Sequence, residues 1–161
     1  VLNSPSPLLQ LGSARWIHMQ EHQACAVLQN GQATCWGSGS YGNLGGSGRT
    51  DYDPLVNVAD ALEIRLGGNN GCARQANHRL TCWGHNRYGV MGNGAIEGIS
   101  YPPTEIPVDA ASHIQVVGGK VCVLDSDGRV VCWGINGSAL APLEVLPEGY
   151  DMERVRGIDV D

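Results

Sequence analysis

Six cysteines are the residues of this 161-residue chain whose type and spacing point most directly to chemistry. They fall into three pairs, and the members of each pair stand ten positions apart. The pairs are Cys25 with Cys35, Cys72 with Cys82, and Cys122 with Cys132. Thiolates could bind zinc, but zinc favours Cys-x2-4-Cys knuckles that bring four ligands together. Because each pair here lies a full repeat from the next, the spacing favours three disulfides.

The nine residues between paired cysteines predict a β-hairpin. Residues 26–34 (AVLQNGQAT) and 123–131 (VLDSDGRVV) place Gly directly after Asn or Asp near the centre, which is typical of hairpin turns. A three-residue loop that ends at Gly31 sets Cys25 opposite Cys35, whereas a two-residue turn does not. We therefore expect a type I turn followed by a G1 bulge. The residues expected at positive φ are Gly31, His78 and Gly128.

This register places each cysteine pair at a non-hydrogen-bonded site of its hairpin. There the Cα atoms are closest, about 4.5 Å apart, which is within disulfide range. Disulfides persist in oxidising compartments. The sequence therefore predicts a secreted, periplasmic or cell-surface protein.

Motifs for catalysis or cofactors are weak. Residues 37–42 spell G-x-G-x-x-G, but no helical pattern follows, so a dinucleotide site is not expected. Asp125-Ser126-Asp127-Gly128 resembles the start of a calcium loop, lacks its distal Glu, and is better interpreted as a turn. The five histidines form no His-Glu-x-x-His motif, and there is no Gly-x-Ser-x-Gly elbow. We expect no enzyme activity, no cofactor and no metal.

Aromatic, arginine and histidine residues in Gly-rich surroundings are the candidates for recognition. Those in the loops between repeats are Tyr41, Arg49, Tyr52, His85, Arg87, Tyr88 and Tyr101. Trp16 is a further candidate, because the residues aligned with it are polar or charged, and this position should face solvent. An exposed aromatic residue there favours an interface; the alternative is that Trp16 only covers the N-terminal end of the fold. Ordinary solvated loops remain the alternative for the other residues.

Charge and hydropathy exclude two classes of partner. Ten Lys and Arg residues stand against sixteen Asp and Glu residues, the net charge is -6, and Lys120 is the only lysine. No basic stripe is available to follow phosphates, so nucleic acid is not an expected partner. No apolar stretch approaches the roughly 20 residues of a membrane-spanning helix, so membrane insertion is not expected.

An internal repeat organises the chain. The cysteine pairs recur at intervals of 47 and 50 residues (Cys25 to Cys72, Cys72 to Cys122), and Trp-Gly follows each second cysteine. A period near fifty is typical of propellers and solenoids. Each unit reads as four short strands: a Pro-led strand, an Ile-containing strand and the two arms of the hairpin. We assign one domain, 1–161, with a linker at 1–6, repeats at roughly 7–53, 54–102 and 103–140, and a partial repeat at 141–161.

Cys-x9-Cys-Trp-Gly followed by a Gly-rich turn, at 38–45 and 85–92, resembles the regulator of chromosome condensation (RCC-type) repeat family in its cysteine-containing, bacterial-type form. The resemblance covers nearly the whole chain and implies an all-β fold of four-stranded antiparallel propeller blades, usually seven. This chain holds about three to three and a half, and its third turn is shortened at 135–138. The family's precedents bind macromolecules; they include a secreted inhibitor of β-lactamases and a chromatin-bound nucleotide-exchange factor.

These observations predict a non-catalytic, extracytoplasmic recognition module. The first expectation is a cell-surface or appendage-tip adhesin that binds protein or glycan through the inter-repeat loops. The alternatives are a secreted protein inhibitor of an enzyme and a purely structural assembly module. Three and a half blades leave two open strand edges. We therefore expect a homo-oligomer or a longer parent chain, with Trp16 or residues 141–161 at the contact between subunits.

Overall fold

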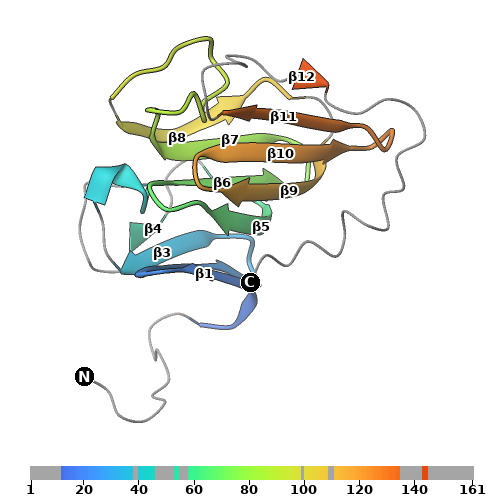
Figure 1. Ribbon diagram of the computed structural model, residues 1–161. Coiled ribbons are helices and arrows are strands. Elements are labelled where there is room, and N and C mark those ends of the chain that lie inside the picture. Colours follow the sequence, from blue (N-terminus) through green and yellow to red (C-terminus); the bar gives the residue numbers. More distant parts are fainter. Residues whose placement is uncertain are drawn as a thin grey trace.

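The computed structural model describes residues 12–37, 40–45, 53–54, 58–98, 100–108, 111–134 and 143–144. Within these ranges the chain forms β-strands and one short 3-10 turn, η1 (Ser40–Gly42) (Figure 1). The expected all-β class is confirmed.

Three antiparallel sheets of four strands each make up the described structure. Blade 1 has the order β1 (Ala14–Gln20), β2 (Gln23–Leu28), β3 (Ala33–Gly37), β4 (Asp53–Pro54). Blade 2 has the order β5 (Ala61–Leu66), β6 (Asn70–Gln75), β7 (Leu80–His85), β8 (Ser100–Ile106). Blade 3 has the order β9 (Ala111–Val117), β10 (Lys120–Asp125), β11 (Val130–Gly134), β12 (Leu143–Glu144). The expected four-stranded blades are therefore present.

The proline-led strands close the preceding sheet instead of opening the next one. Pro54 of β4 pairs with Thr34 of β3, and β8, which contains two prolines, pairs with β7. Each of these strands lies at a sheet edge, where a residue without an N–H group loses no ladder hydrogen bond. The expected grouping of strands into units was wrong in this respect, because the sequence repeat is offset by one strand from the blade.

The hairpins have the expected register. Cys25 lies opposite Cys35, the Leu28 N–H donates to the Gln32 carbonyl at 2.9 Å, and Gly31 has φ 82°. The equivalent residues His78 and Gly128 have φ 64° and 83°. The bulged three-residue loop predicted from the sequence is confirmed in all three blades.

All six cysteines form disulfides in the predicted pairs. Each disulfide joins the second and third strands of its own blade, and the Cα atoms lie 4.1, 4.0 and 4.1 Å apart in blades 1, 2 and 3. These distances are the short ones expected at non-hydrogen-bonded pairs. A disulfide here links two strands that are already neighbours in the hairpin.

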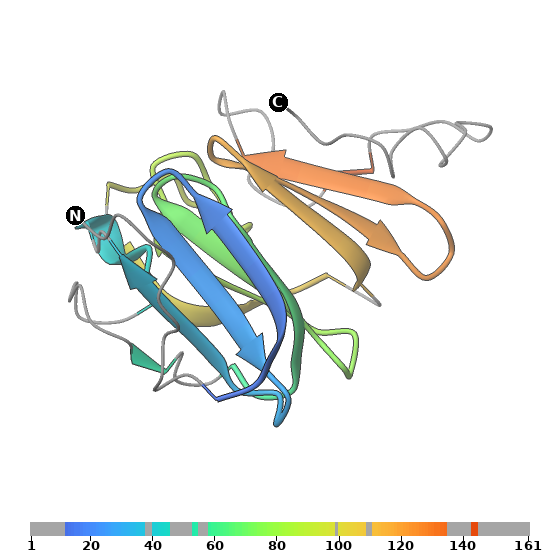
Figure 2. The same cartoon turned by 90° about the horizontal axis from the view of Figure 1, so that it is seen from below.

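Neighbouring blades pack through two apolar clusters, as the sheets follow one another in the view of Figure 2. In the first cluster, Ile64 and Leu66 of β5 pack with the Cys25–Cys35 disulfide and Val27 of blade 1. In the second, Ile114 and Val116 of β9 pack with residues of blade 2, including its disulfide. The core of the molecule therefore lies between the sheets.

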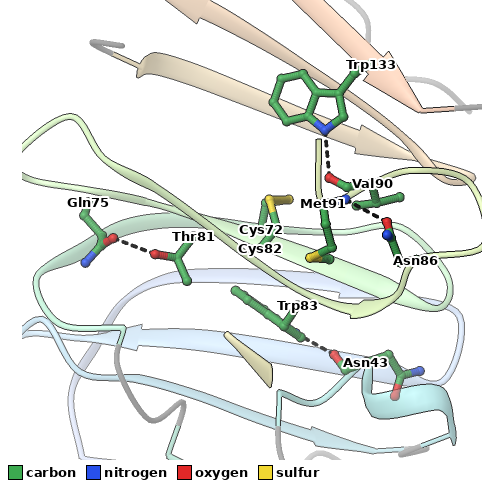
Figure 3. The surroundings of a disulfide bond; sticks show 10 residues. All are labelled: Asn43, Cys72, Gln75, Thr81, Cys82, Trp83, Asn86, Val90, Met91 and Trp133. Carbon is green, nitrogen blue, oxygen red and sulfur yellow. Dashed lines mark hydrogen bonds between the residues drawn. A yellow bond between two sulfur atoms is a disulfide. The ribbon is translucent and has the colours of Figure 1, made fainter. Parts of the chain in front are cut away.

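Two tryptophans of the Trp-Gly motif connect blades 2 and 3 to the loop of the blade before each. The Trp83 indole N–H donates to the carbonyl of Asn43 at 2.8 Å, and the Trp133 indole N–H donates to the carbonyl of Val90 at 2.7 Å (Figure 3). Both side chains are almost completely buried. Since Asn43 and Val90 hold equivalent places in their turns, the same bond recurs at both junctions.

In the part of the chain that the structure describes, no helix is long and apolar enough to cross a membrane.

Candidate functional site

The turn after β3 presents Tyr41 to solvent. Tyr41 lies in η1 with φ 61°, and its side chain is 59% exposed. Such a backbone conformation is uncommon for a residue with a bulky side chain and is found most often at functional sites. The following Gly42 has φ 73°, and a Cβ there would lie 3.0 Å from the Cβ of Ser100. The Gly-rich sequence thus allows the turn to approach blade 2 closely.

Tyr41 contacts the neighbouring blade through its ring and its backbone. Its ring meets the His85 ring edge to face, with centroids 5.3 Å apart and an interplanar angle of 70°. The Ser100 hydroxyl donates to the carbonyl of Tyr41 at 2.6 Å. His85 and Ser100 are paired residues of β7 and β8, so a rigid sheet positions Tyr41.

The loop that follows β7 is organised by Asn86, which is fully buried. Its side-chain oxygen accepts from the Met91 N–H at 3.0 Å (Figure 3), and its amide group donates to the Ala95 carbonyl at 3.2 Å. Its own carbonyl accepts from the N–H groups of Gly89 and Glu97. One asparagine therefore holds both sides of the loop, a role that sequence reasoning missed although Asn86 falls within the repeat's turn.

Arg87 and Tyr88 are exposed residues near the start of this loop. The Arg87 guanidinium lies 5.9 Å from the centre of the Tyr88 ring, within cation–π range. Tyr88 is 42% exposed, and its ring also packs against Gly119 of blade 3, where a Cβ would lie 2.4 Å from the ring. A glycine in the β9–β10 turn is therefore required for the ring to rest there.

Tyr41 and Tyr88 stand at equivalent positions of successive repeats, and each side chain packs against the next blade. Together with His85 and Arg87 they form what we call the tyrosine surface. Figure 1 shows η1 and the loop after β7 at the same end of the blades. The surface combines exposed aromatic rings, phenol hydroxyls and a guanidinium, the side chains most often found at binding hot spots.

The other candidates from the sequence lie elsewhere. The Tyr101 hydroxyl donates to Glu97 at 3.1 Å, and its ring is partly buried against the core cluster of blades 2 and 3, so it supports the loop from below. Trp16 is half-buried between blades 1 and 2. Its indole N–H donates to the Ile64 carbonyl at 3.1 Å, and Arg65 lies over its ring. Arg49 and Tyr52 fall outside the described residues.

The expectation that the Trp16 position faces solvent was wrong. The aligned Glu63 is only 4% exposed, because this position points to the first strand of the next blade. Glu63 accepts from the Ile114 N–H at 2.9 Å and lies 3.4 Å from Arg74 and 3.5 Å from His113. Burial raises the pKa of Glu63, but the hydrogen bond and charge of His113, Arg74 and the Ile114 N–H outweigh it and hold this pKa below its ordinary value.

The carboxylate of Asp125 stabilises the acidic turn at 125–128. One oxygen of Asp125 accepts from the N–H groups of Asp127 and Arg129, each at 2.9 Å, and the other accepts from the Arg129 side chain at 3.1 Å. The interpretation of this segment as a turn is confirmed. Across the described ranges of the chain, no three acidic, histidine or cysteine side chains are grouped as a metal site would require.

Comparisons with known proteins place the fold. No family model matches the chain, and no curated protein matches it. Human WBSCR16 superposes with a TM-score of 0.76 at 17% identity over 87% of this chain. Yeast RCC1 (Prp20) bound to Kap60 gives 0.74 at 15% identity over 90% of this chain. Prp20p of Saccharomyces cerevisiae, studied for its binding to Gsp1p and histones, gives 0.70 at 18% identity over 84%.

The chain spans about 40% of the length of each of these three structures. In this chain the cysteine pair and the Trp-Gly motif recur once in each of the three sheets. The chain therefore has the fold of consecutive RCC1-type β-propeller repeats.

Proposed function

We propose that this chain is a non-catalytic recognition module that works outside the cytoplasm and binds its ligand through the tyrosine surface. The observation that carries the proposal is the fixed arrangement of Tyr41 against His85 and of Arg87 against Tyr88. Exposed aromatic rings held by packing lose little conformational entropy on binding, so they are efficient anchors. We propose a cell-surface or appendage-tip adhesin, of the cysteine-containing bacterial type, as the protein's role.

Observations that bear on the compartment and on the ligand support this proposal. All six cysteines are paired, as in proteins of oxidising compartments. The net charge of -6 disfavours nucleic acid as the ligand. The structurally similar Prp20 binds proteins, including Kap60, which gives a precedent for a protein ligand on this fold. Tyr and Arg side chains are also the ones enriched at protein interfaces. We therefore favour a protein ligand, with a glycan as the competing outcome.

Binding assays separate the candidate functions. Binding of the purified protein to a glycan array would identify a glycan ligand, and binding to a host-surface protein panel would identify a protein ligand. Slowed hydrolysis by enzymes of the β-lactamase class would instead indicate the secreted inhibitor. No binding in any of the three assays would refute recognition and would favour a purely structural module.

Two matched substitutions then assign the site. Tyr88→Ala and Arg87→Ala should each weaken binding of the identified ligand at least about tenfold, as truncation of an interface anchor does. Arg79→Ala is the control, because Arg79 is an exposed arginine in the β6–β7 turn. If Arg79→Ala weakens binding as much as Arg87→Ala does, the tyrosine surface is not the binding site.

A further inference from the structure

Side chains of β1 bond to the edge of β5 across the junction between blades 1 and 2. β5 is an edge strand of its sheet, so the N–H and C=O groups on its outer side have no strand to pair with. The Trp16 indole N–H donates to the Ile64 carbonyl at 3.1 Å, and the Leu66 N–H donates to Nδ1 of His18 at 3.1 Å. Alternate residues of β1 therefore take the place of a neighbouring strand along β5.

Among the described hydrogen bonds between blades 1 and 2, the bond at His18 is the one that a proton can remove near neutral pH. The others are made by backbone groups and by the side chains of Arg15, Trp16, Gln23, Asn43, Trp83 and Ser100, none of which titrates between pH 5 and 8. Neutral imidazole accepts through one nitrogen, here Nδ1, whereas the protonated ring carries an N–H group on both nitrogens and cannot accept. Protonation of His18 therefore leaves the Leu66 N–H without its acceptor.

The surroundings of His18 disfavour a positive charge. Its side chain is half-buried, and burial together with the nearby charge of Arg65 lowers the pKa of His18 below its ordinary value. The junction therefore has its full stability above the ordinary histidine pKa of about 6.5, and it loses stability as the pH falls below that value, because an open junction takes up the proton more readily.

No carboxylate in the described part of the chain is placed to compensate a charged His18. The strands packed against β1 are β2, which carries no group that titrates apart from its disulfide-bonded cysteine, and β5. The ionisable side chains of β5, of β1 and of the turn after β1 are Glu63, Arg65, Arg15, Glu21 and His22. Glu63 is directed to blade 3, where it accepts from the Ile114 N–H, and Glu21 is exposed and forms no ion pair. The charged group that acts on His18 is therefore a cation.

The junction between blades 2 and 3 responds differently to acid. The residue of β5 equivalent to His18 is Arg65, which has no acceptor atom. This junction instead uses Glu63, whose pKa lies below its ordinary value, so its carboxylate stays charged at pH 5 and keeps the bond to the Ile114 N–H. Mild acid therefore acts on the first junction and spares the second.

We propose that the junction between blades 1 and 2 is an acid-sensitive hinge, in which protonation of His18 breaks the bond to Leu66 and loosens blade 1 from blade 2. Tyr41 belongs to the turn of blade 1, whereas its two contacts, the His85 ring and the Ser100 hydroxyl, belong to blade 2. A loosened junction therefore separates Tyr41 from His85 and alters the tyrosine surface. The hinge is independent of the function proposed above, and only its effect on ligand binding rests on that function.

Hydrogen exchange of single amides, followed by NMR at pH 7.5 and pH 5, tests the hinge without any ligand. After correction for the intrinsic pH dependence of exchange, the protection of the Leu66 amide should fall about tenfold at pH 5, as the loss of one hydrogen bond allows. The Ile114 amide is the internal reference, because its acceptor Glu63 stays charged at both pH values. Equal protection of Leu66 at the two pH values overturns the proposal.

His18→Asn separates the charge from the hydrogen bond. The Asn side chain offers an uncharged acceptor oxygen in place of Nδ1, so the protection of Leu66 in this variant should not depend on pH. His22→Asn is the matched control, because His22 is exposed in the turn after β1, and this variant should behave as wild type. A fall in Leu66 protection as large in His18→Asn as in wild type overturns the proposal. Circular dichroism verifies that each variant is folded.

Nuclear Overhauser contacts between the Tyr41 and His85 rings measure the consequence at the tyrosine surface. These contacts should weaken from pH 7.5 to pH 5 in the wild-type protein and persist in His18→Asn, in which His85 is unchanged. Contacts that weaken equally in both proteins would assign the change to His85 itself and refute the link between the hinge and the tyrosine surface.

Discussion

Alanine substitutions at Gly31 and Gly128 separate backbone strain from packing between blades. Both glycines end the same three-residue hairpin loop, with φ 82° and 83°. A Cβ at Gly31 would lie 3.1 Å from the Cα and 3.4 Å from the N of Asp60 in the next blade, whereas a Cβ at Gly128 meets nothing within 4 Å. Gly31 also accepts a hydrogen bond from the Ala61 N–H at 3.1 Å through its carbonyl, so its place is fixed by the junction.

The expected losses follow from these contacts. Gly128→Ala should cost about 1 kcal/mol, the usual penalty for a Cβ in the left-handed region, which lowers the melting temperature by about 2–4 °C in a chain of this length. Gly31→Ala adds about 1–3 kcal/mol, because the backbone of Asp60 must move to admit the methyl group. Its melting temperature should therefore fall at least about twice as far as that of Gly128→Ala.

Thermal unfolding followed by circular dichroism measures both losses. All variants should be compared at one low concentration, because association would raise the melting temperature. Gln29→Ala is the control, since Gln29 is an exposed residue of the same loop, and it should stay within about 0.5 kcal/mol of wild type. Equal losses of melting temperature in Gly31→Ala and Gly128→Ala would show that Asp60 does not crowd the loop. A Gly128→Ala variant with the wild-type melting temperature would refute the strain argument.

The buried carboxylate of Glu63 has a lowered pKa, so its contribution to stability is present above the ordinary glutamate pKa of about 4.3 and is lost as the pH falls through the lowered value. Glu63→Gln should therefore lower the melting temperature more at pH 7 than at pH 3. A difference in melting temperature from wild type that does not change with pH would contradict this. Limited reduction of the dilute protein, followed by alkylation and mass spectrometry, should label Cys122 and Cys132 first, because the other two disulfides are fully buried. Labelling of Cys72 at the same rate would contradict the argument that burial protects a disulfide from reduction. Trp83→Phe should cost about 1–3 kcal/mol in urea unfolding, since the Asn43 carbonyl loses its indole partner; a loss below about 0.5 kcal/mol would show that this bond does not secure the junction.

Local features of the fold could be predicted from the sequence, because they depend on contacts close in the chain. The Gly after Asn30 or Asp127 and the cysteine spacing fixed the hairpin register and the disulfides. The place of the Pro-led strands could not be predicted in this way. Whether β4 joins the hairpin before it or the strand after it depends on pairing across residues 38–52, and both choices satisfy the periodicity of the sequence.

The candidate site was predictable in type but not in arrangement. Tyr and Arg in Gly-rich turns indicated recognition, and four of the candidates form the tyrosine surface. The approach of Tyr41 to His85 depends on how two blades dock, which no local pattern encodes. The solvent exposure of the Trp16 position was predicted wrongly for the same reason. Alignment with the charged Glu63 suggested a position that faces solvent, but Arg74 and His113 compensate that charge within the protein. A buried charge with partners looks like a surface charge in a single sequence.

The hydrogen bonds that Trp16 and Glu63 send into the following blade have opposite polarity. The first junction joins an indole donor to the carbonyl of Ile64, and the second joins a carboxylate acceptor to the N–H of Ile114. The two junctions are therefore not interchangeable: an indole in place of Glu63 would face a buried N–H with a second donor, and a carboxylate in place of Trp16 would face a carbonyl. Each of these two blades therefore carries a polar group that matches its own neighbour. A shuffled or duplicated blade would place two donors or two acceptors against each other at the junction.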